Sequence, residues 1–247
     1  KAAAGAPKIT PSKAYIPAFT QARNAIDAAS KRADVAAAKT AVTNAEAAYR
    51  SARGNAARTQ ARAGFDSAVA ALGGLLQAEK ATLEQAFAAG TTPDDAMLSG
   101  QLALNLGNLA SDKAMQRRGL EAMIQSGKLS PVDAAKYNFY VGGLAYDLKD
   151  FAGARTAFST AIAGGYTENG VEALALLFAA SELDAWAVIL NARQSAHEID
   201  KVAAHCDPRA LFFTDRDSAE AGAHAARHGA TRLTLDGSLT VLASPVN

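Results

Sequence analysis

Nitrogen and sulfur donors gather near the end of the chain, where they could form a metal site. His224 and His228 are four residues apart, which places both imidazoles on one face of a helix, and the pair His205 and Cys206 lies nearby. A site needs these groups to converge, and no acidic third ligand accompanies them. We therefore interpret them as helix-surface and helix-end residues and predict no metal site.

Covalent and phosphate chemistry lack their usual groups. Cys206 as a nucleophile would need an oriented base, and the side chain of its sequence neighbour His205 tends to diverge from it. Gly127 and Lys128 are followed by Leu129, and Ala122 stands where a phosphate-binding loop has its first glycine. There is also no GxSxG motif. We predict a non-catalytic protein without catalytic residues or a cofactor.

Composition narrows the partners further. The 247 residues have a formal net charge of +1, which gives no reason to expect nucleic acid or an acidic membrane. One cysteine excludes an internal disulfide and a zinc ribbon, and no apolar run approaches the roughly 18–20 residues of a membrane span. The first residues, KAAAGAPKITPSKAY, are small, basic and unpatterned; they follow either a removed signal peptide or a trimmed end, and we favour export.

The composition changes abruptly along the chain. All four histidines, the cysteine and the tryptophan lie after Tyr166, whereas the first two-thirds consists mostly of strong helix formers. We predict a flexible segment over residues 1–11, a helical domain over 12–168 and an α/β segment over 169–247.

Start and stop signals divide the helical domain. Thr92 and Ser130 are expected N-caps, each followed by a proline, and the glycine pairs at 73–74 and 164–165 indicate helix ends. The short connections predict that neighbouring helices form antiparallel hairpins. The expected helices cover residues 12–30, 33–50, 56–72, 75–88, 93–110, 113–126, 131–148 and 151–163.

Two of these helices share one apolar spacing. Val35, Ala38, Val42 and Ala45 occur at offsets 0, 3, 7 and 10, and so do Phe151, Ala154, Phe158 and Ala161. These offsets place four apolar side chains on one face of each helix, and we predict that the face with Phe151 is buried. With Gly142 in the preceding helix, the stretch YNFYVGGLAYDLKDFAGARTAFSTAI resembles a tetratricopeptide repeat (TPR). Its closing proline is missing, and residues 51–90 do not match. The resemblance implies an array of helical hairpins, and the alternative is an ordinary helical bundle.

Four arginines, Arg50, Arg53, Arg58 and Arg62, stand together without an acidic residue among them. A nucleic-acid face would need them clustered, with stacking aromatics. Successive helical positions spread them over more than a third of the circumference, so we interpret them as a solvated face.

The spacing of apolar residues along the chain changes from residue 171 onwards. A helix over 171–183 precedes the apolar runs AWAVIL and ALFFT, which read as buried strands, and Ser195 and Glu198 form a capping box for a helix to His205. A helix over 217–228 and the strands TRLTL and TVLAS follow. This alternation predicts a small, incomplete parallel sheet after a mainly α array.

The stretch ALLFAASELDAWAVILNARQSAHEIDKVAAHCDPRALFFT resembles the N-terminal domain of adenylate-forming acyl-CoA synthetases. Asn191, Ala192, Arg193 and the later Glu198 match the family, while Ile189 replaces its usual proline and Asp184 its usual glycine. The resemblance covers about residues 171–247 and implies scaffold alone, because the family's phosphate loop and catalytic lysine have no counterpart here.

Three functions remain open. We favour a non-catalytic helical-repeat scaffold that binds a protein or peptide. The alternatives are a truncated or inactive acid–CoA ligase and an assembly subunit that uses an open sheet edge.

Overall fold

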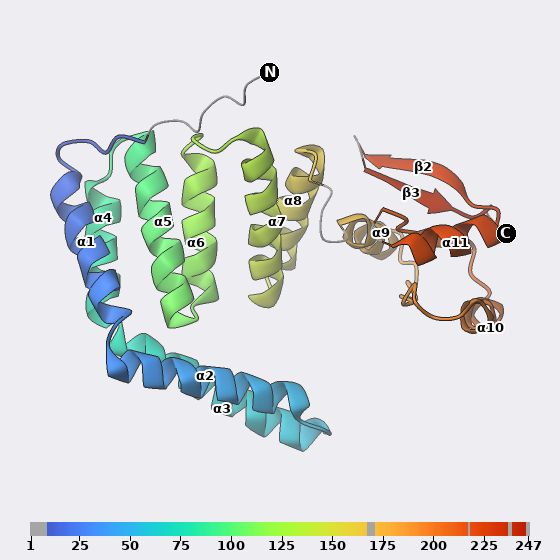
Figure 1. Ribbon diagram of the computed structural model, residues 1–247, viewed down its shortest axis with the longest axis horizontal. Coiled ribbons are helices and arrows are strands. Elements are labelled where there is room, and N and C mark those ends of the chain that lie inside the picture. The colour runs from blue at the N-terminus through green and yellow to red at the C-terminus, as the bar shows by residue number, and fades with distance from the viewer. Residues whose placement is uncertain (1–8, 167–170, 217, 237–238, 246–247) are drawn as a thin grey trace. The chain divides into compact units, whose positions relative to one another are not determined.

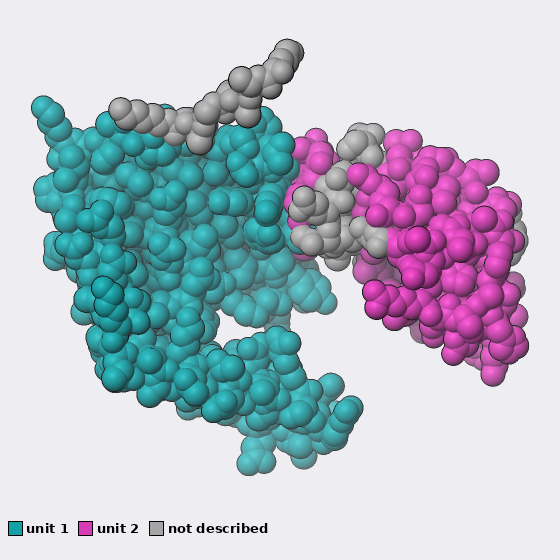
Figure 2. Space-filling model, viewed as in Figure 1, with its two compact units in different colours: residues 1–154 teal, residues 155–247 magenta. Residues whose placement is uncertain are grey.

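The structure is a computed structural model, and the residues described from it are 9–166, 171–216, 218–236 and 239–245. Its chain divides into two compact units, residues 1–154 and 155–247, which we describe separately (Figures 1 and 2). The boundary expected between residues 168 and 169 falls outside the described residues. The helices of the first unit are α1 (Ile16–Ala29), α2 (Ala33–Ser51), α3 (Asn55–Leu75), α4 (Gln77–Ala89), α5 (Pro93–Ala110), α6 (Lys113–Gln125) and α7 (Pro131–Asp147), with the start of α8 (Phe151–Ala163).

The eight helices expected here are all present, and their capping residues act as predicted. The Thr92 hydroxyl accepts a hydrogen bond from the Asp95 amide in a capping box, and the Ser130 side chain accepts from the Asp133 amide. One stop signal was wrong, because α3 continues through Gly73 to Leu75.

The packing order differs from a simple series of hairpins. Helix α1 packs against α4 rather than α2, and α5, α6 and α7 follow as neighbours. Helices α2 and α3 pack on each other and project from the base of the α1–α4 pair (Figure 1). We call this α2–α3 hairpin the arm, and the helices α1 and α4–α7 the array. The expectation of consecutive hairpins is wrong at α1, because the arm is inserted between two helices that pair with each other.

The array and the arm share one apolar core. It is centred on α1, α4 and α5 and extends along a single strip of the arm, so much of the arm's surface is exposed. The buried members are Tyr15, Ala22, Ile26, Ala29, Val35, Val42, Leu72, Leu76, Leu83, Ala86, Leu102, Ala103, Leu106 and Ala110.

The shared apolar spacing behaves differently in its two helices. In α2, Val35 and Val42 are buried, and Ala38 packs against the same core. In α8, Ala154, Phe158 and Ala161 are buried, but Phe151 is 59% exposed. The expectation that Phe151 is a core residue was wrong, because it begins the helix and its ring packs on Tyr146 instead, with centroids 5.5 Å apart.

The second unit contains α9 (Val171–Glu182), α10 (Ala196–Cys206), α11 (Ala219–Arg227) and the strands β1 (Phe212–Phe213), β2 (Thr231–Asp236) and β3 (Leu239–Ala243). The Ser195–Glu198 capping box is present. The strands form an antiparallel sheet in the order β1-β3-β2, so the expected parallel arrangement is wrong. Only two residues separate β2 from β3, and such a short connection joins antiparallel strands.

The run AWAVIL is not a strand. Residues 185–190 have no regular structure, and Trp186 is 98% exposed. A continuous apolar run by itself does not distinguish a buried strand from another segment. The small core of this unit instead joins α11 to β1 through Phe213, Ala221 and Ala225.

No described helix combines the length and the low polarity that crossing a membrane would need.

Candidate functional site

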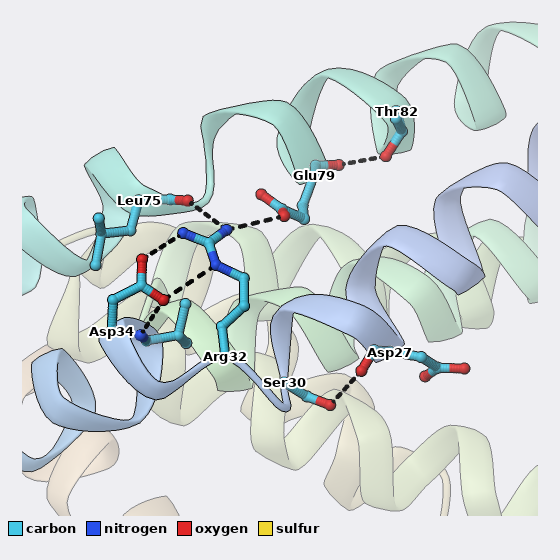
Figure 3. A network of polar contacts seen from close by, with 8 residues as sticks. Asp27, Ser30, Arg32, Asp34, Leu75, Glu79 and Thr82 are labelled. Atoms are coloured by element: carbon cyan, nitrogen blue, oxygen red, sulfur yellow. Dashed lines mark hydrogen bonds and ion pairs between the residues drawn. The ribbon is translucent and has the colours of Figure 1, made fainter.

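A polar corner holds the base of the arm (Figure 3). Arg32, the N-cap of α2, donates from Nε and Nη2 to the two carboxylate oxygens of Asp34, at 3.1 and 2.6 Å. Its Nη1 reaches the Leu75 carbonyl at 3.2 Å and Glu79 Oε1 at 3.3 Å. The hydrogen bonds from Arg32 lower the pKa of Asp34. One guanidinium thus ties the α1–α2 turn to the α3–α4 turn and fixes where the arm leaves the array.

Further ion pairs continue from this corner along one end of the array. Each pair joins two elements, because its members lie in or beside the first or last turns of α4, α6, α7 and α8. The pairs are Lys80–Asp112 at 3.1 Å, Lys113–Asp147 at 2.5 Å and Arg117–Asp150 at 2.7 Å. We call this the arm end of the array, because the arm leaves from it and extends past it (Figure 1).

Large apolar side chains are exposed at the arm end. Tyr146, Leu148 and Phe151 are 58%, 41% and 59% exposed, and the rings of Tyr146 and Phe151 meet edge to face. We call these three residues the aromatic edge. Exposed aromatic groups of this kind, rimmed by charges, are typical of protein-binding surfaces. The carboxylates of Asp147 and Asp150 supply such charges beside them.

The tip of the arm presents arginines. Arg50 pairs with Glu46 at 2.6 Å, and Arg62 pairs with Asp66 at 3.0 Å while its guanidinium lies over the Tyr49 ring. Arg53 and Arg58 are exposed and make no ion pair or side-chain hydrogen bond with any described residue. The interpretation of a solvated face agrees with this exposure, and two guanidinium groups remain available to a partner.

Open space separates the arm from the array beyond the arm's base. Figure 2 shows it as a gap in the surface of the first unit. The arm contacts the array through the start of α4 and through α5. The arm and the arm end therefore form two walls that a segment of another molecule can reach from solvent.

A pocket lies at the opposite end of the array and is a weaker candidate. Its volume is about 370 Å³, and both of its serine hydroxyl groups are already engaged, Ser99 with Tyr15 and Ser126 with the Met123 carbonyl. The lining residues are Phe87, Gly90, Thr91, Thr92, Pro93, Ala96, Ser99, Ala122, Gln125 and Ser126. These polar groups stabilise the fold, which leaves few of them to orient a ligand.

Asp95, beside this pocket, is also structural. It is fully buried and accepts hydrogen bonds from the backbone amides of Ser12, Thr91 and Thr92. Burial raises its pKa, but these hydrogen bonds outweigh burial and hold the pKa at about 2. The carboxylate thus pins the segment before α1 to the start of α5.

No family model matches the chain, and neither the curated proteins nor the solved structures contain a significant match.

The histidines and the cysteine considered from the sequence do not come together as a metal site. His224 is buried, with Nε2 donating to the Ala192 carbonyl at 3.1 Å and Nδ1 accepting from Arg227 at 3.2 Å, so both ring nitrogens are occupied. In the described part of the chain, no three potential ligands are grouped suitably for a metal ion.

His228 contacts the same arginine as His224, because Arg227 Nη2 lies 3.2 Å from His228 Nε2. His228 stacks on Phe213 and lies 3.2 Å from Asp200, whereas His205 and Cys206 are exposed at the end of α10. The expected surface role fits His205, but His224 belongs to the interior of its unit.

Sequence reasoning did not identify the aromatic edge. It assigned Phe151 to the core and gave Tyr146 and Leu148 no role. The available signal was Lys149 and Asp150 beside these residues, since charged residues between two helices mark a solvent-exposed turn.

Proposed function

We propose that the first unit binds a protein or peptide between the arm and the aromatic edge, and that the chain acts as a non-catalytic scaffold. The observation that carries this proposal is the exposure of Tyr146, Leu148 and Phe151 at the end of the array that the arm extends past. Exposing three large apolar side chains together costs solvation free energy that a partner would recover on binding.

The fixed position of the arm supports this function. Arg32 bridges two turns, and the ion pairs along the arm end join the array helices, so the two walls are held before a partner arrives. A preorganised surface loses less conformational entropy on binding than a mobile one. Membership of the TPR group is part of the same proposal, supported by the buried Ala154, Phe158 and Ala161 of α8.

Panning a random peptide library on the full chain tests this proposal. Selected peptides should bind at least tenfold more weakly to Tyr146→Ala and Phe151→Ala, since aromatic anchors dominate such interfaces. The matched control is Val132→Ala, because Val132 is an exposed apolar residue at the other end of α7. Equal loss in all three variants, or no loss in any, would refute the proposed site.

Assembly through the second unit is a second candidate function. Leu183, Trp186, Val188 and Ile189 are each more than half exposed within one short segment. Sedimentation velocity over a range of concentrations tests this candidate. The wild-type protein should show a species larger than one chain, and Trp186→Ser should abolish that species.

The resemblance of residues 171–247 to acyl-CoA synthetases is an alternative origin for the second unit. It is supported by the Ser195–Glu198 capping box beside the Asn191-Ala192-Arg193 match. The residues carry no adenylation chemistry in this proposal. ATP-dependent pyrophosphate release with a carboxylic acid, above a buffer control, would contradict a non-catalytic role.

A further inference from the structure

The tip of the arm has a charge that the proposed function does not use. Between Ala47 and Gly64 the sequence contains four arginines and no acidic residue. Two of them are paired with carboxylates further along the arm, through Arg50–Glu46 and Arg62–Asp66. The excess positive charge is therefore concentrated on the remaining pair, Arg53 and Arg58.

Arg53 and Arg58 lie on either side of the tight turn at Gly54, where φ is +81°. Both are exposed and lack an ion pair with any residue that the structure describes. A guanidinium group presents planar, parallel N–H donors that match a carboxylate, and such charge-assisted pairs are stronger than neutral hydrogen bonds.

The charged residues that flank the aromatic edge in sequence include two aspartates, in contrast to the arginines of the tip. Asp147 and Asp150 lie next to Tyr146 and Phe151 in sequence, and their basic partners Lys113 and Arg117 already neutralise them. The edge offers apolar contact and one exposed lysine, Lys149, whereas the tip offers two free guanidinium groups without exposed aromatic surface. Tyr49, the tip's aromatic residue, is half-buried and covered by Arg62.

We propose that the partner is an acidic amphipathic peptide segment whose carboxylates pair with Arg53 and Arg58 while its apolar side chains pack on Tyr146 and Phe151. This inference rests on the proposed function and adds the chemical class of the partner. A nucleic acid fits less well, because the free arginines of the tip have no exposed aromatic ring beside them on which bases could stack. Charge complementarity thus selects the acidic segment.

The test uses fluorescein-labelled helical peptides of about twenty residues, built from Glu, Ala and Leu, and the full-length protein. Fluorescence anisotropy should show the Glu peptide binding at least tenfold more tightly than an otherwise identical Gln peptide. Arg53→Glu and Arg58→Glu should each weaken the Glu peptide about tenfold, and Arg58→Lys should restore part of the loss. Lys201→Glu, the same charge reversal at an exposed residue of α10, should have no effect.

Several results would overturn this inference. They include equal binding of the Glu and Gln peptides, equal losses in Arg58→Glu and Lys201→Glu, and tighter binding of a single-stranded oligothymidylate than of the Glu peptide. If library peptides bind through Tyr146 and Phe151 but ignore both arginines, the acidic partner is refuted while the proposed function stands. Circular dichroism melts should be unchanged in all these variants, since the substituted residues are exposed.

Discussion

Asp95 shows how one buried carboxylate organises a whole region. It receives three backbone amides from two segments of the chain. Asp95→Asn replaces one carboxylate oxygen by an NH₂ group, which cannot accept a hydrogen bond from a backbone amide. We therefore expect a loss of about 1–2 kcal/mol in the free energy of unfolding. Urea denaturation at neutral pH measures it. Asp133→Asn is the control, because Asp133 lies in the first turn of α7 and its exposed carboxylate accepts from the hydroxyl of the N-cap Ser130.

The same carboxylate predicts a pH dependence. Its pKa is about 2 in the folded protein and near the ordinary aspartate value of 3.8 in the unfolded chain. Because the pKa of Asp95 is lower in the folded state than in the unfolded state, its carboxylate stabilises the fold at pH values above the unfolded-state pKa. This contribution is lost as the pH falls from about 4 towards 2. The stability difference between the wild type and Asp95→Asn should therefore shrink across that range. A difference that stays constant down to pH 2 would contradict the assignment.

Among the elements, the helices were the most predictable part of the fold. Thr92, Ser130 and Ser195 are caps whose geometry depends on residues three positions away, so the sequence contains the complete signal. The pairing of α1 with α4 depends instead on a contact across the inserted arm, which no local pattern specifies. The same limit applies to the site, because the exposure of Tyr146 and Phe151 depends on which helices pack around them.

A close contact between α5 and α6 requires a glycine. A Cβ atom on Gly119 of α6 would lie 2.6 Å from the Leu104 amide nitrogen of α5. We expect Gly119→Ala to cost about 1–3 kcal/mol, because backbone has to move. A Cβ atom on Gly143 of α7 would have no neighbouring atom within 4 Å. Gly143→Ala should therefore stabilise the protein by up to about 1 kcal/mol, because alanine has the higher helix propensity. Thermal melts of the two variants shifting in the same direction would contradict this contact.

Arg32 predicts how firmly the arm is held. Arg32→Ala leaves the carboxylate of Glu79 buried without its cation, so we expect a lower melting temperature and a wider range of arm positions. Spin labels at Ala47→Cys and Asn105→Cys, in a Cys206→Ser background, report the distance between arm and array. Arg50→Ala is the control, because Arg50 pairs within α2. Equal widths of the distance distribution in both variants would show that Arg32 does not fix the arm.

At the scale of the whole molecule, the sequence pattern indicates two regions, but the strands expected in the second region were partly wrong. The apolar runs at 185–190 and 210–214 look alike, yet β1 forms within the second run while the first has no regular structure. Pairing with β3 decides between them, and that contact is distant in sequence. The dipeptide Asp236-Gly237 was the missed signal, since it favours the tight turn of an antiparallel hairpin.

Trp186 tests this account of the second unit in solution. It is the single tryptophan of the chain and is 98% exposed, so intrinsic fluorescence reports on the segment around it. We expect emission close to that of free tryptophan, ready quenching by acrylamide, and little spectral shift when urea unfolds the protein. The unit should nevertheless be folded, because His224 joins α11 to the Ala192 carbonyl.

Limited proteolysis separates an exposed tryptophan in a folded unit from one in an unfolded tail. With a folded unit, cleavage concentrates within residues 183–190, and the fragment that contains α10, α11 and the sheet resists further digestion. His224→Ala serves as the destabilised control, since it removes the hydrogen bond to Ala192 and should speed digestion of that fragment. Blue-shifted emission that resists acrylamide would contradict the exposed segment. If that emission also depended on protein concentration, a second copy of the chain would be covering Leu183, Trp186 and Ile189.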